Sequence, residues 1–93
     1  MKKLVEVYAN SVINKSYTLR EIYINPEYVV SLIPDSHTGI LLSEGRLPHG
    51  LDSNQKFTRV TVHKGSSGTE MVIVGDIATV REKLFTGKSL LKG

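Results

Sequence analysis

The chain contains no cysteine among its 93 residues. It therefore has no disulfide scaffold, no thiol nucleophile and no cysteine-ligated zinc or iron–sulfur site. Long apolar runs are also missing, since no window approaches the roughly 18 consecutive apolar residues of a membrane span. The N-terminal apolar stretch, Leu4 to Val7, contains Glu6 and is too short for a secretory signal. We expect a soluble cytoplasmic protein with no membrane partner.

Basic residues only slightly outnumber acidic ones. The net charge is +3, with 12 basic and 9 acidic residues, which permits a nucleic-acid partner without requiring one. Hydrophobic residues make up 40% and charged residues 23% of the chain, so the composition is that of a folded protein and not of a disordered one. A chain of this length forms one small domain, residues 1–93.

The first third of the chain has the pattern of three strands. Residues 3–9 alternate in pattern, residues 17–24 are rich in Thr, Ile and Tyr, and residues 28–34 are mostly apolar and end at Pro34. These features predict β-strands, with a loop at 10–16. The Asn-Pro-Glu sequence at 25–27 predicts a single helical turn capped by Asn25.

The middle of the chain suggests two hairpins. Turn-forming residues at 35–39 precede the segment 40–45, which begins with Ile-Leu-Leu and predicts a strand that answers 28–34. Residues 46–56 show no periodicity and form the longest predicted loop. The segments 57–64 and 70–75 flank a glycine-rich tip and predict a second hairpin. The continuous apolar run within 70–75 is typical of a strand that is covered on both faces.

One helix is expected at 76–85. Asp76 is a suitable N-cap, an apolar stripe lies at i, i+3, i+7 and i+8, and Gly87 stands where a C-cap glycine is expected. Residues 86–93 are then expected to be a frayed basic tail. The predicted fold is mainly β, of the α+β class: a small antiparallel sheet or partly open barrel with one C-terminal helix packed on it.

The sequence Gly87-Lys88-Ser89 matches the end of a phosphate-binding loop. That motif needs a glycine five residues before Gly87, where Glu82 stands, and a helix after the serine, for which only four residues remain. We interpret it as a helix end, and we expect no cofactor.

The three histidines, at 37, 49 and 63, have no metal-ligand spacing. His49 and Asp52 share the 46–56 loop, but no nucleophile accompanies them. We expect no metal site, no catalytic residues and no enzyme, with an active site in this loop as a third alternative.

The segment 57–64 allows a binding interpretation. If its valines face inward, the opposite face exposes an aromatic ring, a guanidinium and an imidazole, which can stack on bases and contact phosphates. The alternative is that the ring closes the core from the end of the strand and the other two groups are only solvated. The candidate nucleic-acid-binding residues are Lys56, Phe57, Arg59, His63 and Lys64.

The strongly apolar strands favour association. One helix covers one face of a sheet, so the other face or an edge strand needs a partner, and a second copy of the chain is the simplest one. A closed or half-open barrel would instead bury its own inner face.

Part of the chain resembles the small flagellar FlbD (SwrD) family, and similar small phage-encoded proteins of unassigned role. The resemblance lies in "REIYINPEYVVSLIPD", "TGILLSEG" and "EMVIVGDIATVREKL". The corresponding positions are Ile22 to Ile24, Asn25, Glu27, Val29, Val30, Gly45 and Val72 to Leu84. The resemblance implies a turn–strand–hairpin–helix architecture and a non-enzymatic accessory or regulatory character. The N-terminal strand and the segment 46–68 are additions to that pattern.

Taken together, the sequence predicts a non-catalytic cytoplasmic accessory or regulatory module that is oligomeric through its sheet, with itself or a host or cognate protein as partner. A nucleic-acid-binding regulator is the alternative.

Overall fold

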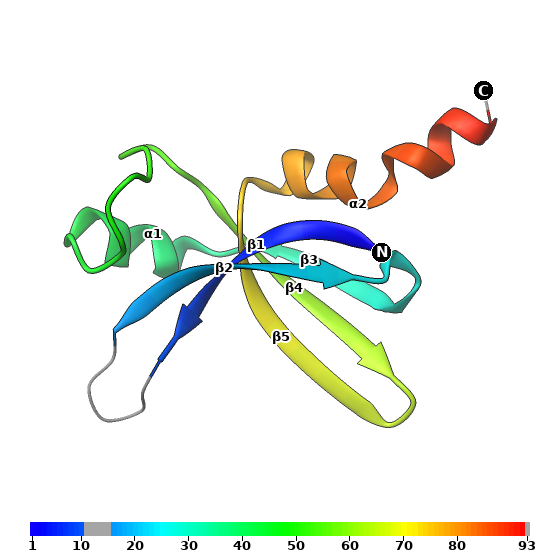
Figure 1. The fold of residues 1–93 in the computed structure, drawn as a ribbon, viewed down its shortest axis with the longest axis horizontal. Helices are drawn as coiled ribbons and strands as arrows, with labels where there is room; N and C mark the ends of the chain where they lie inside the picture. Colours follow the sequence, from blue (N-terminus) through cyan, green and yellow to red (C-terminus); the bar gives the residue numbers. More distant parts are fainter. Residues whose placement is uncertain (11–15, 93) are drawn as a thin grey trace.

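The computed structural model describes residues 1–10 and 16–92, with 87–92 as backbone only. Five strands form one open antiparallel sheet in the order β2-β1-β5-β4-β3 (Figure 1). The predicted α+β fold, an antiparallel sheet with a C-terminal helix packed on it, is confirmed. Over the described residues the sheet is open and not closed into a barrel, and it has five strands where the sequence predicts six. The strands are β1 (Lys2–Ala9), β2 (Tyr17–Ile24), β3 (Val29–Pro34), β4 (Phe57–Lys64) and β5 (Ser67–Val74).

The first hairpin pairs β1 and β2 along their whole length, from Lys2↔Ile24 to Ala9↔Tyr17. The predicted connection between them includes residues 11–15, which lie outside the described residues. After β2 the 3-10 helix η1 (Pro26–Tyr28) begins at Asn25, whose side chain accepts a hydrogen bond from the Glu27 N–H at 3.0 Å. The predicted capped turn is therefore confirmed.

The segment predicted as the strand 40–45 is instead part of helix α1 (Ser36–Ser43). Asp35 caps it by accepting hydrogen bonds from the N–H and the hydroxyl of Thr38, at 3.3 and 2.8 Å. Gly45, at φ 72°, ends it with a Schellman motif, in which Gly45 N–H donates to Leu42 and Arg46 N–H donates to Leu41. A short apolar run fits a strand or a helix equally well, so the caps and the packing decide.

The second hairpin joins β4 and β5, as predicted, but through a two-residue turn, Gly65-Ser66, so β5 begins at Ser67. Gly65 has φ 65°, a conformation that suits glycine in the first position of a type II′ turn.

Helix α2 (Ile77–Lys92) lies over one face of the sheet (Figure 1). Its predicted cap is confirmed, because the Thr79 N–H donates to the Asp76 carboxylate at 2.8 Å. The predicted end near residue 85 is wrong, since the helix continues through Gly87 to Lys92. Its buried stripe completes the main core, which consists of Leu4, Ile24, Val60, Ile73, Val80 and Leu84.

The opposite face of the sheet is covered at one end by α1 and the loop that follows it. A second core cluster forms there from Val7, Leu41, Leu47 and Phe57. Met71 and Ile73 therefore face the first cluster and Val72 and Val74 the second, which confirms that this run is covered on both faces. The expectation that the second face needs a partner is wrong for this end of the sheet, because α1 and the following loop cover it.

Candidate functional site

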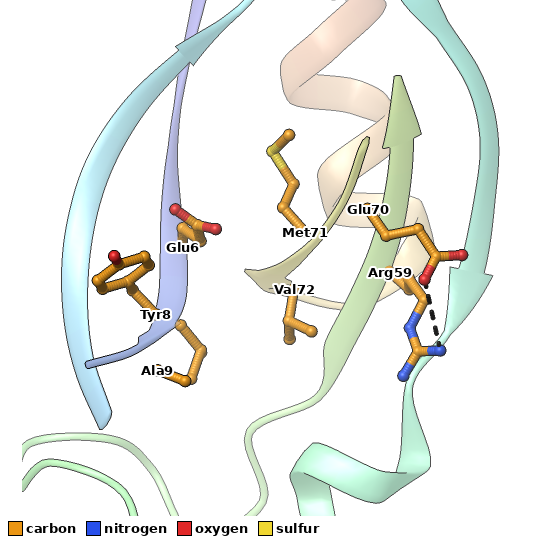
Figure 2. A pocket seen from close by; sticks show the side chains of 8 residues that line it. Glu6, Tyr8, Ala9, Arg59, Glu70, Met71 and Val72 are labelled. Carbon is orange, nitrogen blue, oxygen red and sulfur yellow. Dashed lines mark ion pairs between the residues drawn. The ribbon is translucent and has the colours of Figure 1, made fainter. Parts of the chain in front are cut away.

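The centre of the sheet splits into a cleft. β1 and β5 pair only at Glu6↔Ile73 and Val7↔Val72, and the two hairpins then diverge (Figure 1). The hollow between them has a volume of about 440 Å³. Figure 2 shows the side chains along it. The lining residues are Glu6, Val7, Tyr8, Ala9, Arg59, Glu70, Met71 and Val72.

The hydrogen-bond pattern within each hairpin shows which backbone groups face the cleft. Asn10 N–H donates to Ser16 across the first hairpin, so the even-numbered residues of β1 bond to β2 and Ala9 points its N–H and C=O the other way. Gly75 N–H donates to the Lys56 carbonyl, so the even-numbered residues of β4 and the odd-numbered residues of β5 bond to each other. Glu70 therefore directs its backbone groups toward β1. Ala9 and Glu70 face each other across the divergence without being paired in the ladder.

The charged side chains of the β1 wall are paired. Arg20, from the neighbouring strand, donates to the Glu6 carboxylate at 2.8 Å, and its guanidinium lies 3.7 Å from the centre of the Tyr8 ring. The hydrogen bond to Glu6 raises the pKa of Arg20 above its ordinary value. This arrangement holds the Tyr8 ring beside the cleft, with the residue 38% exposed.

The β5 wall carries a three-member charge network. Arg59 lies 3.9 Å from the Glu70 carboxylate and 3.6 Å from that of Asp35. Burial raises the pKa of Asp35, but the hydrogen bonds from Thr38 and the charge of Arg59 outweigh burial and leave that pKa below its ordinary value. Asp35 is therefore ionised at neutral pH, and its ion pair with Arg59 connects the start of α1 to β4.

The two sheet edges differ in chemistry. β2 carries Arg20 and Glu21, each in an ion pair with a β1 side chain. β3, "VVSLIP", carries no charged residue, and Val30 and Ile33 are 60% and 50% exposed. The Asp35 N–H donates to the Phe57 carbonyl, so from Ser31 on the backbone groups of the odd-numbered β3 residues point toward β4. The N–H and C=O of Leu32 therefore point to the open edge. Such an edge is a template for another strand.

The candidate nucleic-acid-binding residues do not form one exposed face. Phe57 is 3% exposed and packs in the second core cluster, so the expectation that its ring is available for stacking is wrong. Arg59 is held between two carboxylates. Lys56 and His63 are exposed, and the exposed Lys64 lies 5.7 Å from the centre of the Tyr28 ring. The alternative interpretation, in which the strand-end ring closes the core, describes Phe57 correctly.

The three histidines are separated: His37 is on α1, His49 in the loop and His63 on β4, all of them exposed. The Asp52 carboxylate accepts a hydrogen bond from the Asn54 N–H at 2.8 Å and borders a hollow of about 270 Å³ that His49 does not line. Among the described residues, no group of three His, Asp or Glu side chains is placed to hold a metal ion. The side chains of Lys88 and Ser89 lie outside the described side chains.

A larger hollow, of about 630 Å³, lies where α1 and α2 begin. Its acidic side chains, Asp35 and Asp76, already cap those helices, and backbone and side-chain hydrogen bonds from Thr79 lower the pKa of Asp76. Both helix starts are therefore neutralised by the chain's own carboxylates.

Comparisons of the chain with protein-family models, with curated proteins and with solved structures give no match. The resemblance to the FlbD (SwrD) family therefore stays a prediction. In the part of the chain that the structure describes, no helix is both long and apolar enough to cross a membrane.

Sequence reasoning missed two features of this region. The first, Asp35 as a cap, had a signal in the Asp-Ser-His-Thr sequence at 35–38. The second, the facing backbones of Ala9 and Glu70, had none, because it depends on which strands neighbour each other and where their pairing stops.

Proposed function

We propose that this chain is a non-catalytic accessory or regulatory binding module that associates with a second copy of itself through the open edge of its sheet. The observation that carries the proposal is the uncharged, apolar edge strand β3, with Val30 and Ile33 half exposed or more. Charged side chains are one of the devices by which natural sheets protect such an edge, and this chain has charges on β2 and none on β3.

Pairing of β3 with β3 from a second copy fits this strand. An antiparallel two-fold interface places the strand against its own copy, so that each contact between two residues occurs twice, and a strand without charges opposes no like charges in that arrangement. The bulge between Val29 and Ser31 and the terminal Pro34 limit the length of the ladder. We therefore expect a discrete dimer and not an open fibre.

The test is the solution mass, measured by light scattering at low and high salt, with and without a mixed oligonucleotide pool. We expect a multiple of the 10.3 kDa chain mass that salt and oligonucleotides leave unchanged. Val30→Glu should return the mass to that of a single chain. Tyr23→Glu is the matched control, because Tyr23 is an equally exposed side chain (62%) on the other edge strand. A wild-type monomer would contradict the proposal.

The same experiment addresses the alternative function. A mass that rises with oligonucleotides at low salt only would indicate phosphate contacts, which salt weakens, and would favour the nucleic-acid-binding regulator. Lys56→Ala and Lys64→Ala would then reduce that gain, because these two lysines are exposed, one just before β4 and the other at its last residue.

A further inference from the structure

We infer that the cleft between the two hairpins binds an extended, uncharged peptide segment of a partner protein, which pairs with β5 as an added strand. This goes beyond self-association through β3, because it uses the side of β5 that faces β1 and brings in a different polypeptide. Beyond the last β1–β5 pair, Val7↔Val72, the bound segment would lie between the two strands and give, in that part of the sheet only, the order β2-β1-peptide-β5-β4-β3.

The facing backbones identify the class of ligand. Ala9 and Glu70 both direct N–H and C=O groups into the divergence, and the β1–β5 ladder stops before it reaches them. Backbone donors and acceptors on a strand edge are matched by another extended backbone. Because β1 and β5 run antiparallel to each other, a segment between them is parallel to one wall and antiparallel to the other.

The side chains define which segment fits. Strand alternation places Tyr8 and Met71 on the α2 side of the cleft and Ala9 and Val72 on the other side. These four side chains offer apolar contacts to both faces of an added strand, so the segment carries apolar side chains at successive positions.

The charges exclude other ligand classes. The three charged lining residues, Glu6, Arg59 and Glu70, each have an oppositely charged partner within 4 Å. A phosphate or a charged side chain would have to compete with these pairs, whereas an uncharged segment leaves them intact. The cleft volume of about 440 Å³ lies within the range of about 300–1,000 Å³ that is usual for ligand sites.

The test uses the full chain and a library of N-acetylated, C-amidated hexapeptides. One half contains uncharged peptides rich in Val, Ile and Thr, and the other half contains the same peptides with one Lys or Glu. Binding is measured by fluorescence polarisation, and amide hydrogen exchange is followed at Ala9 and Glu70. We expect uncharged members to bind best and to slow exchange at both amides by about tenfold or more.

Two pairs of variants separate the backbone contribution from the rest. Glu70→Pro removes the N–H that faces the cleft and none that bonds to β4, so it should weaken binding about tenfold or more. Glu70→Ala loses the side chain but keeps that N–H, so it should weaken binding clearly less than Glu70→Pro does. Ala9→Trp fills the cleft and should abolish binding. Ala78→Trp, on the exposed side of α2, is its matched control and should have no effect.

Several results would overturn the inference: no binding by any uncharged member, preference for the charged half, equal losses in Glu70→Ala and Glu70→Pro, or full binding by Ala9→Trp. If Glu70→Pro fails to fold by circular dichroism, the Ala9→Trp and Ala78→Trp pair still decides. Failure here is distinguishable from failure of the self-association proposal, because Ala9→Trp leaves the β3 edge and the solution mass unchanged.

Discussion

The Arg59 guanidinium lies 3.6 Å from the Asp35 carboxylate, whose side chain is only 2% exposed. Asp35 in turn receives two hydrogen bonds from Thr38. The N-cap of α1 is therefore tied to the middle of β4, and α1 covers the second core cluster around Phe57. Several properties of the fold follow from this connection.

Replacing Asp35 should destabilise the protein. Asp35→Ala removes the cap, leaves the buried Thr38 without its acceptor and leaves Arg59 with Glu70 alone, so we expect a loss of about 2 kcal/mol in the free energy of unfolding. Urea unfolding at neutral pH measures it. Asp52→Ala, which removes an exposed turn contact, is the control and should cost about 0.5 kcal/mol or less. Equal losses in the two variants would show that the Asp35 network adds nothing.

Acid should weaken the fold through Asp35. Its pKa in the folded protein is lowered, while the unfolded value is about 3.9. The stabilisation is therefore complete above about pH 4 and is lost as the pH falls through the folded pKa. Asp35→Asn has no proton to gain there, so its unfolding free energy should change less than that of wild type on acidification from about pH 6 to about pH 2. Asp76 titrates in both proteins and cancels in the comparison. Parallel pH profiles would contradict this prediction.

His63 and Gly68 should be energetically coupled. They are cross-strand partners, and a Cβ built on Gly68 would lie 2.8 Å from Cδ2 and Nε2 of the His63 ring. Gly68→Ala should therefore displace the ring in wild type and meet nothing there in a His63→Ala background. A four-protein cycle measured by thermal unfolding should give a coupling of about 0.5–1 kcal/mol. A value near zero would mean that the ring moves away at no cost.

Docking of α2 should depend on its buried stripe. Leu84 is fully buried in the main core, so Leu84→Ala should lower the free energy of unfolding by about 3 kcal/mol. Ile40→Ala, on α1 with 54% exposure, should cost less than about 1 kcal/mol. Denaturant titrations of both variants test the difference, and a small loss for Leu84→Ala would show that α2 contributes little to the fold.

The sequence by itself determined the local elements. Alternation predicted β1, the Thr, Ile and Tyr content of residues 17–24 predicted β2, the Asn-Pro-Glu turn predicted η1 and its cap, and Asp76 marked the start of α2. These features depend on the repeat of a strand or helix and on side chains that bond to their own neighbours in the chain. Neighbouring residues contain that information, so it can be read without the rest of the fold.

Tertiary structure decided what depends on distant partners. Residues Ile40 to Leu42 are helical because Leu41 is buried in the second core cluster and Asp35, the helix cap, forms an ion pair with Arg59. Phe57 turned inward because α1 and the following loop cover it. The cleft exists because the β1–β5 ladder ends at Val7 and Val72. Strand order, sheet twist and the end of a ladder involve residues far apart in sequence, and no local pattern encodes them.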